Sequence, residues 1–415
     1  MTRLYRDRRF ATYWAGQAVS DLGDRVSELA LPLIAITTLG ASSIEVGVLT
    51  AAVWAPQLLS LFVGAWVDQQ PRKRRLLIAS DLLQALAVAT LPLVWWLGTL
   101  TLAQLVMVAL VAGVGRTLSQ TAYAPFFASL VTRDRYVEAN SLLGATQSGS
   151  FVAGPALGGA LIQVLGAPVT MVVDALSFVF SAHMTSRVRV RERPPTGHTE
   201  SLVRRAAQGF GYLRRHPYMA PSLRCCTTLN FFSFVAATLV VLYASRTLGL
   251  SAGTIGLAFG IGAVGGLIGA LLAGRIARWI GAGYTIAVGA VLFSAPYALV
   301  PLASGTDWAR AAVLALVEAI SGFGIMLFDI NLNALQTAVV HDDLRSRVSG
   351  AFATVNYGIR PLGALVGGAL GSVVGIGPTL VVAAVGGTLS FLWLVRSPIL
   401  STRAIADLQP VADDA

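Results

Sequence analysis

Residues 44–75 read IEVGVLTAAVWAPQLLSLFVGAWVDQQPRKRR, an apolar run with one charged residue, Glu45, followed by Asp68 and a basic cluster at 72–75. About 20 mainly apolar residues are enough for a helix to cross the hydrocarbon core of a membrane. Arg and Lys accumulate in loops on the cytoplasmic side. This stretch therefore predicts a membrane-spanning helix over about 44–67, with its C-terminal end at the cytoplasmic face.

The composition of the whole chain agrees with this interpretation. Of its 415 residues, 55% are hydrophobic and only 12% are charged, whereas about 25% are charged in an average soluble domain. The net charge of +10 could suggest an anionic polymer as partner, but the basic residues fall in short clusters between apolar runs. That pattern is typical of membrane topology. A soluble fold, a disordered chain and a nucleic-acid-binding protein are therefore excluded, and the lipid bilayer is the expected surrounding.

The chain divides into twelve candidate spans at charge clusters and at Pro or Gly turns. They cover about 11–38, 44–67, 75–97, 102–126, 139–165 and 168–186 in the first half, and about 226–246, 252–276, 283–303, 311–337, 347–373 and 377–395 in the second. Every second connection is rich in Arg, and only Arg246 and Arg310 lie near the opposite side. The positive-inside rule then puts both termini and the central loop in the cytoplasm of a multi-pass protein of the inner (cytoplasmic) membrane.

The basic stretch 187–224 divides the chain into two halves. We expect an N-terminal six-helix bundle at 1–190, a cytoplasmic linker at 191–224, a C-terminal six-helix bundle at 225–400 and a cytoplasmic tail at 401–415. The linker contains an amphipathic helix from Glu200 to Arg215, with an apolar face formed by Leu202, Ala206, Phe210 and Leu213. This helix is expected to lie on the inner leaflet; a solvated linker helix is the alternative.

The two halves resemble each other. The segment 64–68 at the end of the second span has a counterpart at 274–278 in the eighth, and Pro155 in the fifth span has one in Pro361 of the eleventh. The spacings agree closely. They favour a duplicated six-span unit, as in transporters built from parallel repeats.

The loop after the second span carries a motif that resembles a family signature. Gly64 and Asp68, with the basic cluster at 72–75, are similar to the G-x3-D-R-x-G-R-R/K signature between the second and third spans of the major facilitator superfamily. Gln69 and Pro71 stand where Arg and Gly are usual. The resemblance implies a gate at this loop.

A second motif lies in the fifth span and resembles the core of the superfamily's antiporter motif, with Ser150 in place of the preceding Gly; its residues are Gly154, Pro155, Gly158 and Gly159. Three further segments look like the branch of siderophore exporters (enterobactin exporter-like) and macrolide or multidrug efflux proteins: Trp14 to Asp24, Asp174 to Phe178, and Gly209 to Pro217. The resemblance covers essentially the whole chain. It implies an all-α membrane protein with twelve transmembrane helices in two six-helix parallel repeats, and it implies export.

Polar residues inside the first span form one helical stripe, made of Gln17, Asp21, Asp24 and Glu28. A charged residue at the bilayer centre costs about 2.5–3.5 kcal/mol on insertion scales. These side chains must therefore face a wet cavity or one another. For Asp21, an ion pair with Arg25 on the next turn is the structural alternative.

Three other spans carry polar residues: Arg116, Gln120 and Tyr123 in the fourth, Thr227, Asn230 and Phe234 in the seventh, and Glu318, Gly322, Asp329, Asn333 and Gln336 in the tenth. In the superfamily that the motifs resemble, spans 1, 4, 7 and 10 line a central cavity. The residues predicted to line a substrate cavity are Gln17, Asp21, Gln120, Tyr123, Asn230, Phe234 and Asn333.

Asp24 and Arg116 both fall near mid-depth when they are counted from the membrane edges. An acid beside a fixed guanidinium can alternate between an ion pair and a protonated state, which proton coupling requires. A permanent pair that fixes the first span to the fourth is the alternative. The residues predicted to take part in proton coupling are Asp24, Glu28, Arg116, Glu318 and Asp329, the last two meeting a polar or cationic substrate.

A cytoplasmic gate is predicted at the inner end of the second span, formed by Gly64, Asp68, Arg72 and Asp81. A carboxylate there can hydrogen-bond to a facing helix end when the cytoplasmic side is closed; ordinary loop charge is the alternative. Asp81, in the third span, is expected to hold the basic loop. Helix bending or close packing is predicted at Gly154, Pro155, Gly158, Gly159 and Pro361.

The sequence lacks the motifs of an enzyme or a metalloprotein. Lys73 is its only lysine and belongs to no phosphate-binding loop, the four histidines lack metal-ligand spacing, and no G-x-S-x-G elbow occurs. No cofactor, metal or enzymatic activity is therefore expected. We predict a monomeric, proton-coupled exporter (antiporter) of a small amphipathic compound such as a drug, siderophore or secondary metabolite. An importer or facilitator of the same fold and a non-transporting membrane receptor are the alternatives.

Overall fold

The computed structural model describes residues 4–190, 192 and 202–409. Every regular element in these ranges is helical, and they contain no strand. The chain forms two compact units, Met1–Thr199 with Ser251–Gly260, and Glu200–Leu250 with Ile261–Ala415.

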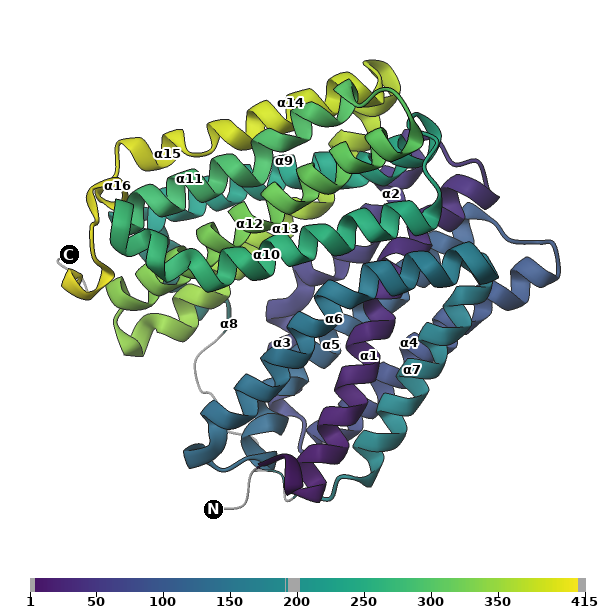
Figure 1. Ribbon diagram of the computed structural model, residues 1–415. Helices are drawn as coiled ribbons and strands as arrows, with labels where there is room; N and C mark the ends of the chain where they lie inside the picture. Colours follow the sequence, from purple (N-terminus) through teal and green to yellow (C-terminus); the bar gives the residue numbers. More distant parts are fainter. Residues whose placement is uncertain (1–3, 191, 193–201, 410–415) are drawn as a thin grey trace. The chain divides into compact units, whose positions relative to one another are not determined.

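The first unit contains six long helical segments (Figure 1). They are α1 (Arg8–Leu33), which continues as a π-helical turn (Ile34–Thr38), α2 (Ser43–Trp54) with α3 (Ser60–Gln69), α4 (Lys73–Trp96), α5 (Leu102–Leu130), α6 (Tyr136–Leu165) and α7 (Ala167–Arg187). Short 3-10 turns lie at Leu4–Arg6 and Arg133–Arg135. A further 3-10 turn, Ala55–Leu59, separates α2 from α3, because Pro56 has no amide hydrogen to continue the α-helix.

The second unit begins with α8 (Leu202–Arg215) and holds six further long segments. They are α9 (Met219–Arg246), α10 (Ala252–Ile280), α11 (Ala282–Ser294) with its 3-10 continuation (Ala295–Leu302), α12 (Asp307–Val339), α13 (Asp342–Val373), and α14 (Ile376–Leu389) with the short α15 (Leu392–Val395). The chain then forms α16 (Pro398–Ser401) and a 3-10 turn at Ile405–Asp407. The first turns of α10 group with the first unit.

The described residues provide twelve helical segments of membrane-spanning length. Ten of them are both long and apolar enough to cross a membrane. The other two, α1 with 26 residues and α13 with 32, are long enough but carry several charged side chains. The predicted all-α membrane fold is thereby confirmed.

The helix contacts repeat from one unit to the other. In the first unit α1 packs against α6 and α7, and α4 packs against α5 and α7. In the second unit α9 packs against α13 and α14, and α11 packs against α12 and α14. The same pairs of spans thus meet in both units, as a duplication of six spans requires.

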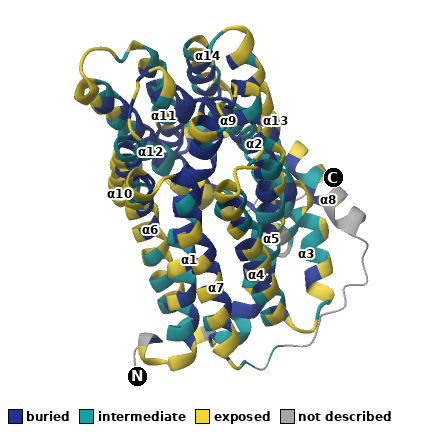
Figure 2. Ribbon diagram, turned by 90° about the vertical axis from the view of Figure 1, so that its right-hand side faces the viewer, coloured by how far each residue is buried: buried dark blue, intermediate teal, exposed yellow. Residues whose placement is uncertain are grey.

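The outer surface of each unit is apolar, unlike that of a soluble protein, and some polar side chains are buried inside. Leu86 of α4, Val164 of α6 and Leu271 of α10 are 70%, 81% and 75% exposed, whereas Ser80 and Ser222 are fully buried. Figure 2 shows exposed and buried residues on different sides of the helices. Outward-facing apolar side chains with polar side chains inside suit a lipid environment.

Small residues let α6 lie close to α1. A Cβ added to Gly154 would meet the Arg25 side chain, and one added to Gly158 would lie 3.1 Å from the Val26 Cα. A Cβ on Gly159 would lie 2.9 Å from the Cα of Gly256, in the same unit. These contacts agree with the predicted packing role of the three glycines. Pro155 and Pro361 lie inside the continuous helices α6 and α13.

The amphipathic helix of the linker, α8, packs against α9 and α13. Leu213 is fully buried in the hydrophobic cluster of the second unit, and Phe210 packs against that cluster. A Cβ added to Gly209 would lie 2.6 Å from the Arg347 carbonyl oxygen. The side chains of Leu202 and Ala206 lie outside the described residues. The described part of the apolar face is therefore covered by protein, and its predicted position on the inner leaflet stays a prediction.

Candidate functional site

A cavity of about 450 Å³ lies within the first unit, between α1, α4, α5 and α6. It is lined by every residue predicted from spans 1 and 4, namely Gln17, Asp21, Asp24, Glu28, Arg116, Gln120 and Tyr123. Gln120 also accepts a hydrogen bond of 2.8 Å from Gln57, in the interruption of the second span. The polar stripe of α1 thus faces a cavity. This was expected because charged side chains that face lipid cost free energy.

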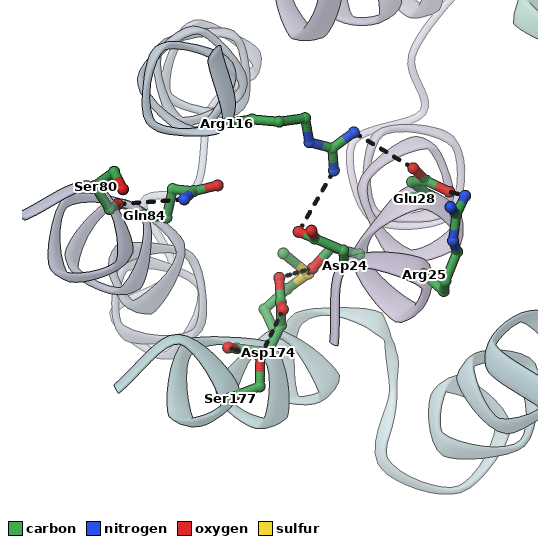
Figure 3. A network of polar contacts seen from close by, with 10 residues as sticks. Asp24, Arg25, Glu28, Ser80, Gln84, Arg116, Asp174 and Ser177 are labelled. Atoms are coloured by element: carbon green, nitrogen blue, oxygen red, sulfur yellow. Dashed lines mark hydrogen bonds and ion pairs between the residues drawn. The ribbon is translucent and has the colours of Figure 1, made fainter. Parts of the chain in front are cut away.

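Arg116 of α5 bridges two carboxylates of α1. Its Nη2 lies 3.4 Å from the Asp24 Oδ1, and its Nη1 lies 3.4 Å from the Glu28 Oε1. Glu28 also accepts a hydrogen bond of 2.8 Å from Arg25 through its other oxygen. Figure 3 shows the Arg116 side chain reaching from its helix toward both acids. The predicted proximity of Asp24 and Arg116 is present in the structure.

Arg25 does not form the ion pair with Asp21 that was the structural alternative to a cavity-facing role. It pairs with Glu28 instead, and its guanidinium lies 5.0 Å from the centre of the Phe151 ring. Among the described residues, Asp21 forms neither a hydrogen bond nor an ion pair. An ion pair within α1 therefore does not account for Asp21. Glu28, and not Asp21, pairs with Arg25 on the same helix.

Asp174 of α7 belongs to the same network, although sequence reasoning did not select it as a site residue. It is 1% exposed and accepts hydrogen bonds from the Ser27 hydroxyl of α1 and, at 3.2 Å, from the Ser177 hydroxyl (Figure 3). The available signal was an acid within the apolar run 168–186. Its hydroxyl partners tie α7 to α1 next to the charged stripe.

Asp81 lines the cavity of the first unit and is buried, and no hydrogen bond or ion pair among the described residues joins it to the basic loop, so its predicted role in holding that loop gains no support. The spacing from the helix start suggested proximity to the loop, but the α-helix turns this side chain inward. Other residues hold the loop. The Lys73 ammonium donates to the carbonyl oxygens of Val67, Asp68 and Gln70 at 2.5, 2.9 and 2.5 Å.

Glu192 and Arg74 connect this loop to the end of α7. The Glu192 carboxylate accepts hydrogen bonds from the backbone amides of Lys73 and Arg74, at the start of α4. Arg74 donates to the carbonyl oxygens of Ser186 and Val188 at 2.9 and 2.8 Å. The other predicted gate residues lie on α3 and at its boundary with α4: Gly64 is half-buried, and Asp68 and Arg72 are exposed.

A second cavity, of about 460 Å³, lies within the second unit between α9, α12 and α13. Four of the predicted residues line it: Asn230, Phe234, Asp329 and Asn333. The structure adds amide, aromatic and charged side chains that sequence reasoning did not select: Asn356, Phe293, Phe328, Phe352, Tyr357, Arg345 and Arg360. Each unit thus contains its own polar cavity.

Glu318 does not line this cavity, and the prediction that it meets substrate together with Asp329 is not supported. Its carboxylate is buried and accepts from the Tyr297 hydroxyl at 3.3 Å through either oxygen. A Cβ added to Gly262 of α10 would lie 2.7 Å from its Cβ. Glu318 and Asp329 share a helical stripe, but eleven residues at about 1.5 Å each separate them by roughly 16 Å along the axis. Tyr297 and α10 cover the stripe at the level of Glu318.

Arg360 of α13 is the cation of the second cavity that sequence reasoning missed. Its Nε donates to the Asn230 Oδ1 at 3.0 Å, and the Asn230 amide donates to the Asn356 Oδ1 at 2.8 Å. Its guanidinium lies 5.0 Å from the Phe234 ring centre and 4.4 Å from that of Tyr357. The available signal was an Arg in the middle of the apolar run 347–373, directly before Pro361.

Neither cavity has the arrangement of a metal centre. Within the described ranges, no group of three or more His, Cys, Asp or Glu residues could hold a metal ion. Cys225 and Cys226 are buried free thiols. The side chains present can instead bind protons and hydrogen-bonding organic groups.

An all-helical protein with two repeated six-span units and a charged cavity inside each is a membrane transporter. Residues 13–364 match the profile of the Major Facilitator Superfamily. The chain belongs to this superfamily, and it is a multi-pass transporter of small molecules, not an enzyme.

Two bacterial relatives are efflux proteins. The multidrug efflux pump Tap of Mycobacterium tuberculosis is 26% identical over 412 residues, which cover 94% of this chain and 93% of the pump. The macrolide efflux protein A of Streptococcus pyogenes is 25% identical over 218 residues, covering 50% of this chain and 52% of that protein. The resemblance to the efflux branch is confirmed by these relatives.

Solved structures share the fold. A bacterial homologue of the iron transporter ferroportin, in an inward-facing state, superimposes with a TM-score of 0.72 at 18% identity over 94% of this chain and 100% of the other. A bacterial homologue of the human lysosomal transporter Spinster gives a TM-score of 0.73 at 14% identity over 99% and 100%. At these identities the likeness concerns the fold alone.

Proposed function

We propose that this protein is a proton-coupled exporter, an antiporter that moves a small amphipathic compound out of the cell by alternating access. The observation that carries the proposal is the position of Arg116 between Asp24 and Glu28, in a cavity within membrane-spanning helices. The efflux relatives support the direction of transport.

The charge arrangement suits reversible proton binding. A guanidinium shared by two carboxylates keeps one ion pair when the other carboxylate is protonated, so Arg116 is not left without a counter-charge. Proton binding at Asp24 would then weaken the link between α1 and α5, while Glu28 holds Arg116 in place. A proton can shift the equilibrium between two conformations only if it changes the contacts of one conformation more than those of the other. A weaker contact between α1 and α5 would be such a change.

The remaining steps of the transport cycle involve the predicted gate and two helices that contain a proline predicted to allow bending. Asp68 and Arg72 gate the cytoplasmic side together with Gly64, and Pro155 and Pro361 allow α6 and α13 to bend. Both termini are cytoplasmic, the protein lies in the cell's inner membrane, and it works as a monomer. The substrate binds in the polar cavities, and the protons bind on α1.

Transport into proteoliposomes tests this proposal. Purified protein is reconstituted with an acidic lumen, and ethidium and radiolabelled erythromycin are offered outside. We expect the liposomes to accumulate at least one of these compounds only when the pH gradient is present. Protein-free liposomes should not accumulate it. Flux that ignores the gradient would indicate a facilitator. Binding of a compound without any flux would indicate a receptor.

A further inference from the structure

The cavity of the first unit contains more acidic than basic side chains. Its charged lining residues are four acids and two arginines, namely Asp21, Asp24, Glu28, Asp81, Arg25 and Arg116. Both arginines already have acidic partners: Arg25 contacts Glu28, and Arg116 contacts Asp24 and Glu28 (Figure 3). Among the described residues, no cation forms an ion pair with Asp21 or Asp81. Two acids of this cavity therefore lack a counter-charge in direct contact.

Asp81 and Tyr13 contribute buried polar atoms to the same cavity. Asp81 is 6% exposed, Tyr13 is fully buried, and both line the cavity. The Asp81 Oδ2 and the Tyr13 hydroxyl have no hydrogen-bond partner among the described residues. Because a buried carboxylate without a partner costs free energy, it takes up either a proton or a cation. The tyrosine hydroxyl can accept a hydrogen bond from an ammonium group. These atoms indicate a ligand that carries hydrogen-bond donors.

Asp21 and Asp81 lie at different levels of the cavity. Tyr13 of α1 and Leu77 of α4 belong to the same buried cluster. Asp21 follows Tyr13 by eight residues, about 12 Å along the helix axis, and Asp81 follows Leu77 by four, about 6 Å. One span, Ser43–Gln69, separates α1 from α4, so the two helices run in the same direction. The two carboxylates are therefore offset by roughly 6 Å along the helices.

A compound with two ammonium groups matches this arrangement. One group can pair with Asp21 and the other with Asp81, whereas a single ammonium leaves one carboxylate without a counter-charge. An anion would be repelled by both acids. The rings of Tyr123 and Phe178 also line the cavity, and they can pack against an apolar linker between the two ammonium groups.

We propose that the cavity of the first unit binds organic dications, with one ammonium group on Asp21 and the other on Asp81. The inference rests on the proposed function, because it names the class of substrate that the exporter carries. It places the cationic substrate in the first unit, whereas the sequence led us to expect it at Glu318 and Asp329 of α12. It also gives Asp81 a role in the cavity that this residue lines.

Three probes with the same ring and length test how many positive charges the cavity requires. They are 1,4-bis(aminomethyl)benzene, a dication, 4-(aminomethyl)benzyl alcohol, a monocation, and 1,4-bis(hydroxymethyl)benzene, which is neutral. Isothermal titration calorimetry measures their binding to the full-length protein in phosphatidylcholine nanodiscs, with empty nanodiscs as the blank. The dication should bind about tenfold more tightly than the monocation, and the monocation about tenfold more tightly than the neutral probe, because each step removes one charge-assisted hydrogen bond.

Variants test whether each ammonium group pairs with one of the two acids. In Asp21→Asn or Asp81→Asn, the preference for the dication over the monocation should fall to less than about twofold, because only one of the two carboxylates is left. Binding of the monocation should change by less than about threefold, since the other acid still accepts it. Asp134→Asn, the same substitution at an exposed residue outside the cavity, should keep the full preference. Asp21→Glu and Asp81→Glu retain the charge and should retain a preference for the dication.

Equal binding of the dication and the monocation to the native protein would overturn the proposal, as would a preference that survives both asparagine substitutions. Equal loss of both amines in the asparagine variants, without recovery in the glutamate variants, would show that the two acids only shape the cavity, and it would also overturn the proposal.

These measurements need no proton gradient, so their outcome is separate from the transport test. Binding of the dication without its gradient-driven transport would contradict only the exporter assignment. Gradient-driven transport of ethidium by a protein that shows no preference for the dication would contradict only the substrate class.

Discussion

The Asp24 carboxylate of α1 lies 3.4 Å from the Arg116 guanidinium of α5, and both residues line a cavity inside the first unit. The two residues are far apart in the sequence and come from helices that share few other contacts, since α1 packs mainly against α6 and α7. This ion pair, with its extension to Glu28, is therefore a principal polar link between α1 and α5 among the described residues.

Removal of Arg116 should loosen that link. Arg116→Gln leaves Asp24 without its positive partner and Glu28 with Arg25 alone. Because the side chains are partly exposed to the cavity, we expect a loss of about 1–2 kcal/mol, less than for a fully buried pair. Thermal unfolding in detergent measures it. Arg310→Gln, which breaks an exposed pair with Asp307 three residues away on α12, serves as the control and should leave the melting temperature nearly unchanged; an equal loss in both variants would contradict this role of Arg116.

Asp174 should contribute to stability through its hydroxyl partners. Asp174→Ala removes the carboxylate that accepts from Ser27 and Ser177. The Ser177 hydroxyl keeps its bond to the Asp174 carbonyl oxygen, whereas the buried Ser27 hydroxyl loses its carboxylate acceptor and α7 loses this link to α1. A loss of about 2–3 kcal/mol is expected. Ser177→Ala removes only the two hydrogen bonds that its hydroxyl donates within α7 and should cost less than half as much. If thermal unfolding shows the two variants to be equally unstable, the link between α1 and α7 is not the reason for the burial of Asp174.

Glu192 should order the loop between α3 and α4. Its carboxylate accepts from two backbone amides at the start of α4, where the helix dipole also favours a negative charge. In Glu192→Ala those amides lose their partner, and hydrogen exchange at Lys73 and Arg74 should become about tenfold faster, which corresponds to about 1.4 kcal/mol of local opening. Glu45→Ala, at a helix start elsewhere in the same unit, is the matched control. Unchanged exchange at Lys73 would refute this role.

Asp68 and Arg72 should act on the rate of transport more than on substrate binding. A gate changes the populations of the open and closed states, and the binding site itself is left intact. For Asp68→Asn and Arg72→Ala we expect turnover to fall about tenfold, equivalent to a shift of about 1.4 kcal/mol between the two states. Stopped-flow transport and equilibrium binding, measured on the same preparations, separate the two effects. Normal turnover with lost binding would place these residues in the binding site.

The sequence predicts the spans well because a membrane-crossing helix needs a certain length and an apolar composition. Both can be recognised within the sequence of each span. It also predicts the proximity of Asp24 and Arg116, since both were placed at the same depth on spans that face one cavity. The sequence predicts the start of the seventh span less well. The span was predicted to begin at about 226, whereas α9 begins at Met219. The first turns of α9 contain polar residues, so the apolar pattern used to place the span begins only later.

Errors arise where a residue's neighbours come from other helices. Helical periodicity gives the face of a side chain but not what covers that face at a given depth, and this explains why Glu318 was expected in the cavity that Asp329 lines. For Asp81, the distance along the sequence to the basic loop was mistaken for contact with it. Asp174 and Arg360 were missed because their importance lies in their partners, Ser27 on α1 and Asn230 on α9, which no local pattern reveals.

The central claim is that proton binding at Asp24 drives transport. Asp24→Asn resembles the protonated carboxyl in shape but cannot release a proton, so it should uncouple the gradient from substrate movement while leaving the substrate site intact. Asp134→Asn, the same change at an exposed residue before α6, is the control.

The most direct measurement uses a compound that the native protein transports. Its accumulation driven by a pH gradient is followed in proteoliposomes that contain native, Asp24→Asn or Asp134→Asn protein. Equilibrium binding of the same compound is measured on each protein. We expect Asp24→Asn to bind the compound as the native protein does and to accumulate none of it above protein-free liposomes, while Asp134→Asn accumulates it normally. Accumulation by Asp24→Asn at the native rate would contradict the account and would pass the role to Glu28 or to another acid of the cavity.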